Sequence, residues 1–159
     1  MSLAISFALE CIRKRVSPLH LVSHDPLTGA FSRLAWDLWG THIKGVCHLA
    51  VDLDGFKLVN DLYGHPAGDS VLARVSDILT RHDSRVFRLG GDEFVILAPP
   101  YDKTLRRMAN EIVAEVASAA LGVTASVGIG PSYESADAAL YEAKRAGKNR
   151  VVVAGGGHA

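Results

Sequence analysis

The chain has 159 residues, of which 48% are hydrophobic and 21% charged, which is the size and composition of one globular domain and excludes a disordered chain. Lysine plus arginine and aspartate plus glutamate both number 17, so the net charge is zero, and neither a nucleic acid nor a membrane surface is indicated as a partner. The cysteines, Cys11 and Cys47, lack disulfide or metal-ligand spacing, so we expect a reduced, cytoplasmic protein. The apolar run at residues 3–9 is too short to span a bilayer and lacks the features of a secretory signal.

Residues 1–22 are predicted to form a helix followed by a linker. Apolar side chains within residues 3–16 recur four, three and four residues apart, as on the seam of a coiled coil, and Ser17-Pro18 ends the helix. Two interpretations stay open: the helix is the stub of a dimerising stalk, or it packs on its own domain. At the other end of the chain, residues 156–159 are expected to be a flexible tail.

The next predicted elements are a helix, a buried strand and a second helix. Residues 31–39 have helical spacing, and we interpret Trp36 and Trp39 as packing residues. Residues 45–51 are mostly apolar, which is typical of a buried central strand, with His48 as a structural residue inside it. A helix follows Gly64 to Gly68, and its apolar residues share one face: Val71, Leu72, Val75, Ile78 and Leu79.

The second half of the chain begins with a predicted β-hairpin, residues 85–89 and 93–98. A helix, a strand, a helix capped by Ser135 and a last strand follow at residues 104–119, 123–130, 135–145 and 151–153. The order from residue 46 to 130 is therefore β-α-β-β-α-β. This predicts an α+β domain at residues 23–155 with the ferredoxin-like arrangement, a central antiparallel sheet with helices on one face.

The hairpin turn, Gly90-Gly91-Asp92-Glu93, carries two consecutive carboxylates. Its glycines can adopt φ > 0 and have no Cβ, so a ligand can approach the backbone. Taken alone, the turn would be interpreted as an ordinary hairpin with solvated acids. A second acidic stretch, Asp52-Leu53-Asp54-Gly55-Phe56-Lys57, changes this interpretation, because the predicted topology brings the strand that ends at Asp52 beside the hairpin.

Carboxylates that converge at one sheet edge predict a divalent cation. Asp52 and the two acids of the turn would repel one another without a cation, and oxygen-only ligands select Mg²⁺ or Mn²⁺. Such an ion usually completes its shell with substrate phosphates. Lys57 beside the metal would suit a polyphosphate. Lys144 and Lys148, four apart near the end of the last helix, are expected to add positive charge on one face, although each lysine alone would be interpreted as a solvated surface residue.

Gly90-Gly91-Asp92-Glu93-Phe94 is the GGDEF pentapeptide, and the chain resembles the GGDEF family of diguanylate cyclases. The likeness covers roughly residues 23–153 and rests on ordered blocks with matching spacing. These blocks are Asp25-Pro26-Leu27-Thr28-Gly29, residues 52–69, the pentapeptide, and residues 139–150. The resemblance implies a palm-type domain that condenses two GTP molecules to cyclic di-GMP with release of two pyrophosphates. Because each domain would hold one GTP, it also implies a homodimer.

The resemblance further implies the roles of the acidic residues. Asp52, the Leu53 carbonyl and Asp92 would hold the metal ions. Asp92 or Glu93 would accept the proton of the attacking 3′-hydroxyl, with Asp92 ranked first, and Lys57 would assist catalysis by neutralising phosphate charge. Asp54 would support the site without touching the substrate.

The substrate contacts implied by the resemblance come from seven residues: Phe56, Lys57, Asn60, His65, Asp69, Lys144 and Lys148. Among them, Asn60 and Asp69 would read the guanine edge, because an amide and a carboxylate match its acceptors and donors. The three lysines would neutralise phosphate charge.

The chain departs from the family at the inhibitory product site. Many members carry an Arg-x-x-Asp in which five residues separate the Asp from the pentapeptide, and here that register gives Arg81-His82-Asp83-Ser84. Ser84 replaces the expected Asp, and Asp83 is one position off, so its side chain would point the other way on an extended backbone. Arg81 and Arg88 remain as the basic part of a degenerate site, and we expect weak or absent product inhibition.

Family members usually carry an N-terminal sensor or receiver domain, whereas here only about two dozen residues precede the cyclase domain. The chain is either a fragment of a protein with an upstream sensor or a stand-alone cyclase. The alternative function is a non-catalytic GTP-binding or protein-interaction module. Loss of Asp52, Asp92 or Glu93 would favour that alternative, and all three are present.

Overall fold

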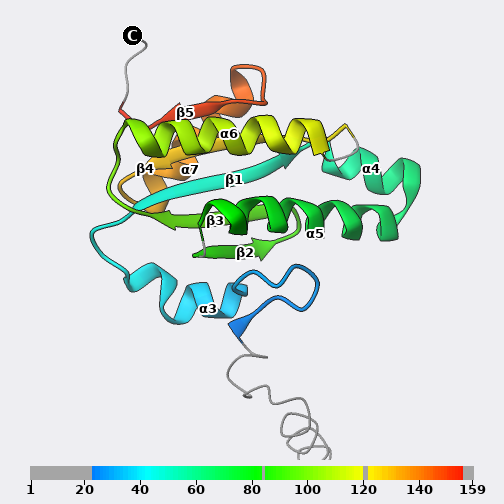
Figure 1. The fold of residues 1–159 in the computed structure, drawn as a ribbon, viewed down its shortest axis with the longest axis horizontal. Coiled ribbons are helices and arrows are strands. Elements are labelled where there is room, and N and C mark those ends of the chain that lie inside the picture. Colours follow the sequence, from blue (N-terminus) through cyan, green and yellow to red (C-terminus); the bar gives the residue numbers. More distant parts are fainter. Residues whose placement is uncertain (1–22, 84, 120–121, 156–159) are drawn as a thin grey trace, which may run out of the picture.

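The computed structural model describes residues 23–83, 85–119 and 122–155, which form a five-stranded sheet covered by helices (Figure 1). The strands are β1 Cys47–Asp54, β2 Val86–Gly90, β3 Glu93–Ala98, β4 Thr124–Gly130 and β5 Val151–Val153. The helices are α3 Arg33–Leu38, the 3-10 helix η1 Gly40–His42, α4 Phe56–Tyr63, α5 His65–His82, α6 Lys103–Ala119 and α7 Tyr133–Arg145. The predicted N-terminal helix and the predicted tail lie outside the described residues.

The strand order is β2-β3-β1-β4-β5, with β1 in the centre. β1 pairs antiparallel with both β3 and β4, and β2 pairs antiparallel with β3. This confirms the predicted β-α-β-β-α-β order and its central antiparallel sheet. β5 adds a strand parallel to β4 at the edge, so the complete sheet is mixed.

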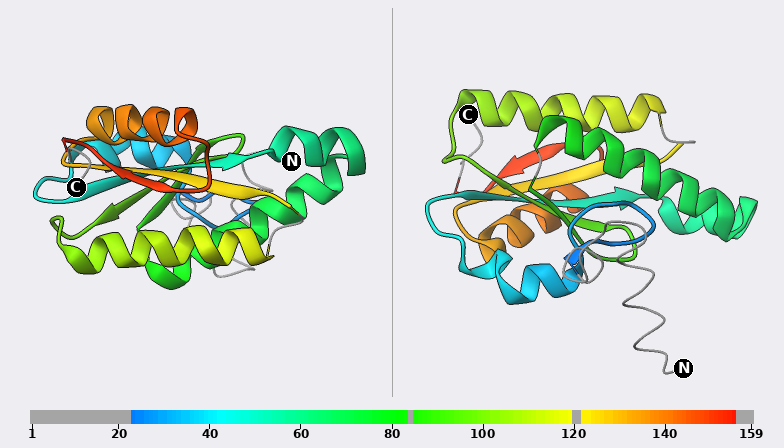
Figure 2. Two further views of the ribbon diagram at one scale, coloured as in Figure 1. Left: turned by 90° about the horizontal axis from the view of Figure 1, so that it is seen from above. Right: turned by 60° about the horizontal axis from the view of Figure 1, so that its bottom comes forward.

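The helices cover both faces of the sheet. α5 and α6 lie on one face, whereas α7 and α3 lie on the other (Figure 2). The prediction of helices on one face was made for the β-α-β-β-α-β unit, and its long helices α5 and α6 do share one face. α3 and α7, which cover the other face, come before and after that unit in the chain.

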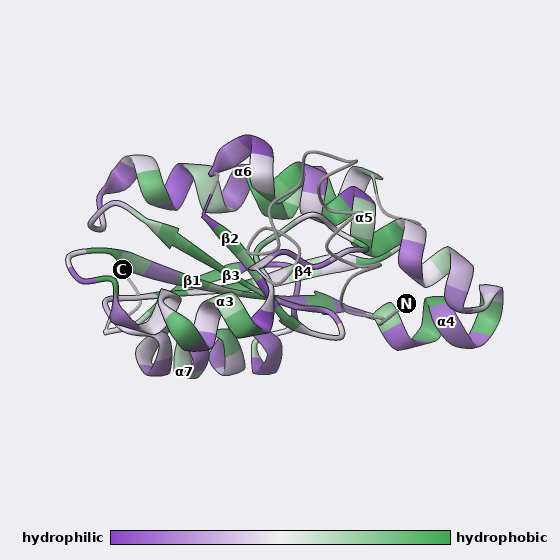
Figure 3. Cartoon of the chain, turned by 90° about the horizontal axis from the view of Figure 1, so that it is seen from below, coloured by the Kyte–Doolittle hydropathy of each residue, from purple (hydrophilic) through white to green (hydrophobic). Residues whose placement is uncertain are grey.

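The two faces have separate cores because side chains alternate along each strand. On β1, Leu49 and Val51 pack with α5 and α6 in the main core, which also contains the fully buried Ile112. Ala50, between them, contacts Ala136 of α7 instead. In Figure 3 the strands are largely hydrophobic, and the helices have hydrophilic residues on their outward sides.

An aromatic cluster under α3 completes the second face. Trp36 is 4% exposed and packs edge-on against Phe87 of β2, with ring centroids 5.4 Å apart. Trp39 contacts the same Phe87 ring at 4.9 Å. The prediction that both tryptophans are packing residues is confirmed.

Three local differences from the sequence prediction affect the site. β1 extends to Asp54, two residues past Asp52, and α4 follows it where no helix was expected. α7 begins at Tyr133 because Ser132 is its N-cap, with Ser135 as the third residue of a capping box. α7 ends at Arg145, so Lys148 lies beyond the helix with φ 63°, and the prediction that Lys144 and Lys148 share one helical face was wrong.

Candidate active site

The hairpin turn between β2 and β3 has the open backbone that its glycines predict. Gly90 has φ 154° and Gly91 has φ 49°, and the pairing shifts register between Arg88 and Gly90. A methyl group built on either glycine would meet no other atom within 4 Å. A ligand can therefore approach the backbone of this turn closely.

The predicted convergence of carboxylates at this edge is confirmed. The antiparallel register pairs Asp52 of β1 directly with Glu93 of β3, and Asp92 precedes Glu93 in the turn. Burial raises the pKa of Asp52, the Lys144 ammonium opposes that rise, and the charges of Asp92 and Glu93 add to it. Lys144, in the last turn of α7, donates a hydrogen bond to the Asp52 carboxylate. The site thus combines several acidic groups with one cation.

Asp54 lies on the same face of β1 as Asp52 but has a different environment. It is 7% exposed and accepts hydrogen bonds from the Thr124 hydroxyl at 2.9 Å and the Ser126 hydroxyl at 2.9 Å. The backbone N–H of Asn149 donates a further hydrogen bond, at 3.1 Å. Asp54 therefore links β1 to β4 and to the segment after α7, and both of its carboxylate oxygens accept hydrogen bonds from within the protein.

The corner between α4 and α5 brings Asn60 next to the start of α5. Gly64, with φ 83°, makes the corner, and the Asn60 side chain packs against Gly68, where a Cβ would lie 1.9 Å from Oδ1 of Asn60. That Oδ1 atom is buried and has no hydrogen-bond partner among the described residues. Asp69 follows Gly68 and is exposed. This corner therefore carries an amide oxygen from α4 and a carboxylate from α5.

The other predicted substrate residues occupy different environments around this corner. His65 begins α5, and both it and Lys57 are exposed. Phe56 is 9% exposed and belongs to the main core, where it lies beside Gly68. Its ring therefore supports the corner from behind.

A family model described as "Diguanylate cyclase, GGDEF domain" matches residues 22–150 of this chain. The chain belongs to this family. The match includes the hairpin turn, the end of β1, the α4–α5 corner and Lys144, which are the parts of the candidate site described above.

Two relatives of the GGDEF domain are diguanylate cyclases by name. "Diguanylate cyclase DgcM" of Escherichia coli is 36% identical over 162 residues, which cover 85% of this chain and 39% of DgcM. "Probable diguanylate cyclase DgcT" of the same species is 33% identical over 163 residues, which cover 84% of this chain and 36% of DgcT. The chain thus spans about two fifths of the length of these relatives.

A solved structure agrees with the GGDEF fold over almost the whole chain. The coiled coil and GGDEF domain of DgcB from Caulobacter crescentus, in complex with c-di-GMP, has a TM-score of 0.81 and 29% identity, covering 96% of this chain and 97% of that one. The active GGEEF domain of a diguanylate cyclase from Vibrio cholerae has a TM-score of 0.64 and 28% identity, covering 72% of this chain and 85% of that one.

Within the described residues, no helix is long and apolar enough to cross a membrane.

This GGDEF domain offers carboxylate oxygens for a metal ion but not a complete set of metal ligands. Across the described residues, no three His, Cys, Asp or Glu side chains gather as a ready-made metal cage. Mg²⁺ does not need one, since it is commonly held by one or two carboxylates together with substrate phosphates. Asp52 and Asp92 fit this pattern, and the pairing of β1 with β3 stops at Asp52, one residue before Leu53.

The two arginines of the degenerate inhibitory site already have partners within the GGDEF domain. Arg81 donates to Glu115 of α6 at 3.1 Å, and His82 contacts the same carboxylate at 2.9 Å. Arg88 donates to the Gly91 carbonyl at 2.8 Å and to Asp25 at 3.0 Å. Ser84, which replaces the family's Asp, lies outside the described residues.

The contact between Arg88 and Asp25 is a site feature that the sequence did not predict. Asp25 also accepts hydrogen bonds from the backbone and hydroxyl of Thr28, and these hydrogen bonds help to lower its pKa against the effect of burial. Arg88 therefore joins the N-terminal turn to the Gly91 carbonyl of the hairpin turn. The signal available was the polar turn motif Asp25-Pro26-Leu27-Thr28-Gly29, but nothing in that motif identifies a partner 63 residues away.

Proposed function

We propose that this GGDEF domain is an active diguanylate cyclase, which condenses two GTP molecules to cyclic di-GMP and releases two pyrophosphates. The observation that carries the proposal is the pairing of Asp52 with Glu93 across β1 and β3, with Asp92 in the adjoining turn. Loss of any of these acids would favour a non-catalytic module, and none is lost.

Diguanylate cyclases of this family are metal-dependent, and we propose Mg²⁺ or Mn²⁺ for this chain. Asp52, the Leu53 carbonyl and Asp92 would hold the ions, because all three are oxygen donors at one edge of the sheet. When bound, the ions would stabilise the negative charge that develops on the transferred phosphoryl group. The raised pKa of Asp52 fits this role, since a nearby cation relieves the cost of its buried charge.

The α4–α5 corner would bind the base, and the lysines would bind the phosphates. Asn60 has a buried amide oxygen without a partner, which can pair with a donor on the guanine edge, and Asp69 adds a second acceptor. His65 lies at the start of the same helix. The exposed Lys57 and Lys148, with Lys144 beside Asp52, would neutralise the triphosphate.

The chemistry transfers one nucleotidyl group in each of two equivalent steps. The 3′-hydroxyl oxygen of one GTP attacks the α-phosphorus of the other, a phosphodiester bond forms, and the bond to pyrophosphate breaks. The hydroxyl proton passes to Asp92 or Glu93, and Asp92 is our first choice. Lys144 keeps the Asp52 carboxylate in position and adds positive charge at the reacting phosphates.

Two copies of the domain must meet face to face, because each holds a single GTP and the attack is reciprocal. A two-fold homodimer, at least transient, is therefore part of the proposed mechanism. The buried, free Cys47 agrees with a reducing, cytoplasmic location. Control of dimerisation by an upstream sensor domain would agree with the greater length of DgcM and DgcT.

The test is to incubate the purified chain with GTP and Mg²⁺ at several protein concentrations and to analyse the products by chromatography. We expect cyclic di-GMP from the wild type, with a specific rate that rises with protein concentration, and none from Asp92→Ala. Asp77→Asn is a matched control, because it removes one exposed carboxylate of α5 outside the site. GTP binding without product, also when two chains are forced together by a fused dimeriser, would favour the non-catalytic module.

A further inference from the structure

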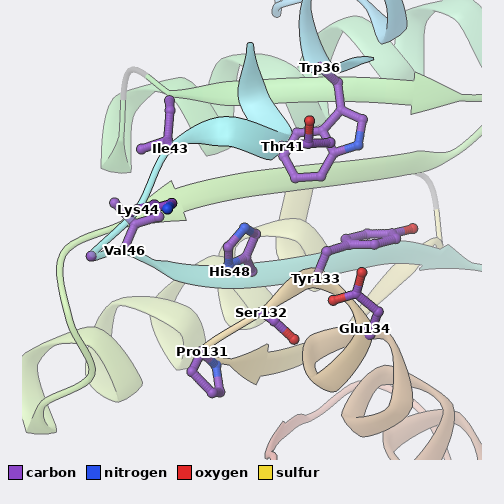
Figure 4. Close-up of a pocket in the computed structure, with 11 residues that line it drawn as sticks. Trp36, Thr41, Ile43, Lys44, Val46, His48, Pro131, Ser132, Tyr133 and Glu134 are labelled. Carbon is purple, nitrogen blue, oxygen red and sulfur yellow. The ribbon is translucent and has the colours of Figure 1, made fainter. Parts of the chain in front are cut away.

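Two buried polar side chains, His48 and Asp54, lie near the two ends of β1 on the face toward α7. His48 lies in the wall of a cavity of about 350 Å³, beside Trp36 and Tyr133 (Figure 4). Its buried Nδ1 atom has no hydrogen-bond partner among the described residues. Asp54 lies two residues, or about 7 Å, along the strand from Asp52, and its carboxylate accepts several hydrogen bonds. Asp54 is therefore the buried polar group that lies next to the candidate active site.

One partner of Asp54 belongs to the segment that follows α7. Thr124 and Ser126 of β4 donate their hydroxyls, and the third donor is the backbone N–H of Asn149, at 3.1 Å. The residue before Asn149 in the chain is the exposed Lys148. The Asp54 carboxylate therefore connects β1 directly to the backbone beside this lysine.

The segment after α7 has a strained backbone. Lys148 has φ 63° and Asn149 has φ 48°, and in the described part of the chain these are the two non-glycine residues with positive φ. Asparagine adopts this left-handed conformation more readily than most residues, whereas lysine has no such preference. Strained residues persist where surrounding contacts hold them, and they are concentrated at ligand-binding sites. The strain at Lys148 therefore indicates that its position is held for a purpose.

Hydrogen bonds on both sides hold Lys148 in this conformation. Its backbone N–H donates to the Ala143 carbonyl at 3.0 Å, and its own carbonyl accepts from Nε of Arg150 at 2.9 Å. Both of these partners are close to Lys148 in the sequence. The hydrogen bond from Asn149 to Asp54 instead joins the segment to a strand 95 residues away. Asp54 therefore fixes where the segment lies relative to β1.

The last turn of α7 brings a second lysine to the same edge. Lys144 donates a hydrogen bond to the Asp52 carboxylate, and Asp52 and Asp54 lie on the same face of β1. Lys144 is thus held at the acidic edge by its side chain, whereas Lys148 is held there by its backbone. This leaves the exposed side chain of Lys148 to interact with a bound anion.

We propose that Asp54 is a positioning residue, which holds Lys148 where its ammonium contacts the terminal phosphates of GTP. This inference rests on the proposed function, because it concerns the same substrate. Asp54 does not touch the triphosphate and acts through the N–H of Asn149. Asp54 therefore contributes to the preference for a triphosphate over a monophosphate and not to recognition of the base.

The test measures binding without turnover. NMR titrations of the isotope-labelled chain with Mg²⁺ give the Kd of a GTP analogue that has a methylene group between its α- and β-phosphates, and the Kd of GMP. In Asp54→Ala, the Kd of the analogue should rise about tenfold, as expected for loss of one charge-assisted contact, and the Kd of GMP should change less than about twofold. In a Lys148→Ala background, Asp54→Ala should raise the Kd of the analogue less than about twofold, because the contact through which it acts is already lost.

Two control variants separate this role from the links to β4. Ser126→Ala and Thr124→Val each remove a hydroxyl that donates to Asp54 but keep the N–H of Asn149, so neither should change the Kd of the analogue. Asp54→Asn keeps the size of the side chain and serves as a second variant if Asp54→Ala does not fold. It has one neutral acceptor oxygen for three donors, so it should raise the Kd of the analogue by a smaller factor.

The outcomes distinguish this inference from the proposed function. An unchanged Kd of the analogue in the Asp54 variants, or an equal loss of affinity for the analogue and for GMP, would overturn the positioning role and leave the proposed function intact. Additive effects of Asp54→Ala and Lys148→Ala would also overturn it, because the two residues would then act independently. Failure of the wild type to bind the analogue would overturn the proposed function as well.

Discussion

The two faces of the sheet differ in what their side chains do. Toward α5 and α6, β1 directs a continuous apolar row, Cys47, Leu49, Val51 and Leu53. Toward α7, the same strand alternates in His48, Ala50, Asp52 and Asp54. One strand therefore contributes apolar side chains to the main core on one side and polar side chains to the candidate active site on the other.

α7 lies close to β4 on the face that carries the polar side chains of β1. A Cβ at Gly128 would lie 2.0 Å from the Ala136 carbonyl oxygen, so the backbone of α7 rests directly on the strand. This close approach brings Lys144 to Asp52 at one end of α7 and Tyr133 to the His48 cavity at the other. Substitutions on the face toward α7 should therefore change activity more than stability, and substitutions on the face toward α5 and α6 should change stability more than activity.

The largest expected effect is on activity, at Asp52. Asp52→Asn should lower the rate of cyclic di-GMP formation at least about 1000-fold, or about 4 kcal/mol, because a metal-binding carboxylate is lost. Stability should not fall. Because the fold raises the pKa of Asp52, the charged carboxylate is disfavoured in the folded state. The Tm of the neutral Asp52→Asn variant should therefore be between zero and about 3 °C higher than that of the wild type.

The pH dependence of that stability difference follows from the same shift. Above the raised pKa, Asp52 is charged in both states and destabilises the fold. As the pH falls through that pKa toward the ordinary value of 3.8, the folded protein takes up the proton first, and the difference from Asp52→Asn should disappear. Thermal melts of both chains across this range measure it. A clear loss of stability in the variant at neutral pH would contradict the assignment of Asp52 to the chemical face.

The opposite result is expected for the main core. Ile112 of α6 is 0% exposed, and Ile112→Ala should lower the free energy of unfolding by about 3 kcal/mol through lost burial and a residual cavity. Denaturant titration measures this, and the rate per folded molecule should stay unchanged. Leu38→Ala, at a residue of α3 that is 63% exposed, is the control and should change little.

A smaller effect on substrate binding is expected at Gly68. In Gly68→Ala, the new Cβ would overlap Oδ1 of Asn60, so the amide must move, and the KM for GTP should rise about tenfold with a smaller change in kcat. Alanine has a higher helix propensity than glycine by about 1 kcal/mol, so Gly68→Ala would stabilise α5 if the new Cβ met no other atom. A lower stability of the variant would therefore be further evidence for the steric overlap with Asn60. Ser70→Ala, two residues after Gly68 and on the exposed side of α5, serves as the control. An unchanged KM would remove Asn60 from base recognition.

The strands and the acidic edge could be predicted from the sequence because the strands are mostly apolar and the hairpin turn fixes which strands meet. α4 was missed because its apolar residues do not share one face: Phe56 and Val59 are buried, whereas Leu58, Leu62 and Tyr63 are exposed. The start of α7 was misplaced because Ser132 and Ser135 can both cap a helix.

Long-range polar contacts could not be predicted at all. The sequence contains Arg88 and Asp25 as separate residues, and only the folded sheet brings them together beside the hairpin turn. The same is true of the unpaired nitrogen of His48, which the sequence presents as one polar residue in an apolar strand. In both cases the information lies in what surrounds the side chain, and local patterns do not contain it.

The smallest expected effect concerns Arg81, on the outer surface of the α5 and α6 face. Its ion pair with Glu115 is exposed on both sides, so Arg81→Ala should change stability by less than about 0.5 kcal/mol. The same variant should leave product inhibition unchanged, because the wild type lacks the partner Asp and is expected to be inhibited weakly or not at all. The measurement is the initial rate against added cyclic di-GMP for both chains. Submicromolar arrest of the wild type that Arg81→Ala relieves would show that the arginine leaves Glu115 to bind product, and this outer surface would then regulate the enzyme as well as stabilise it.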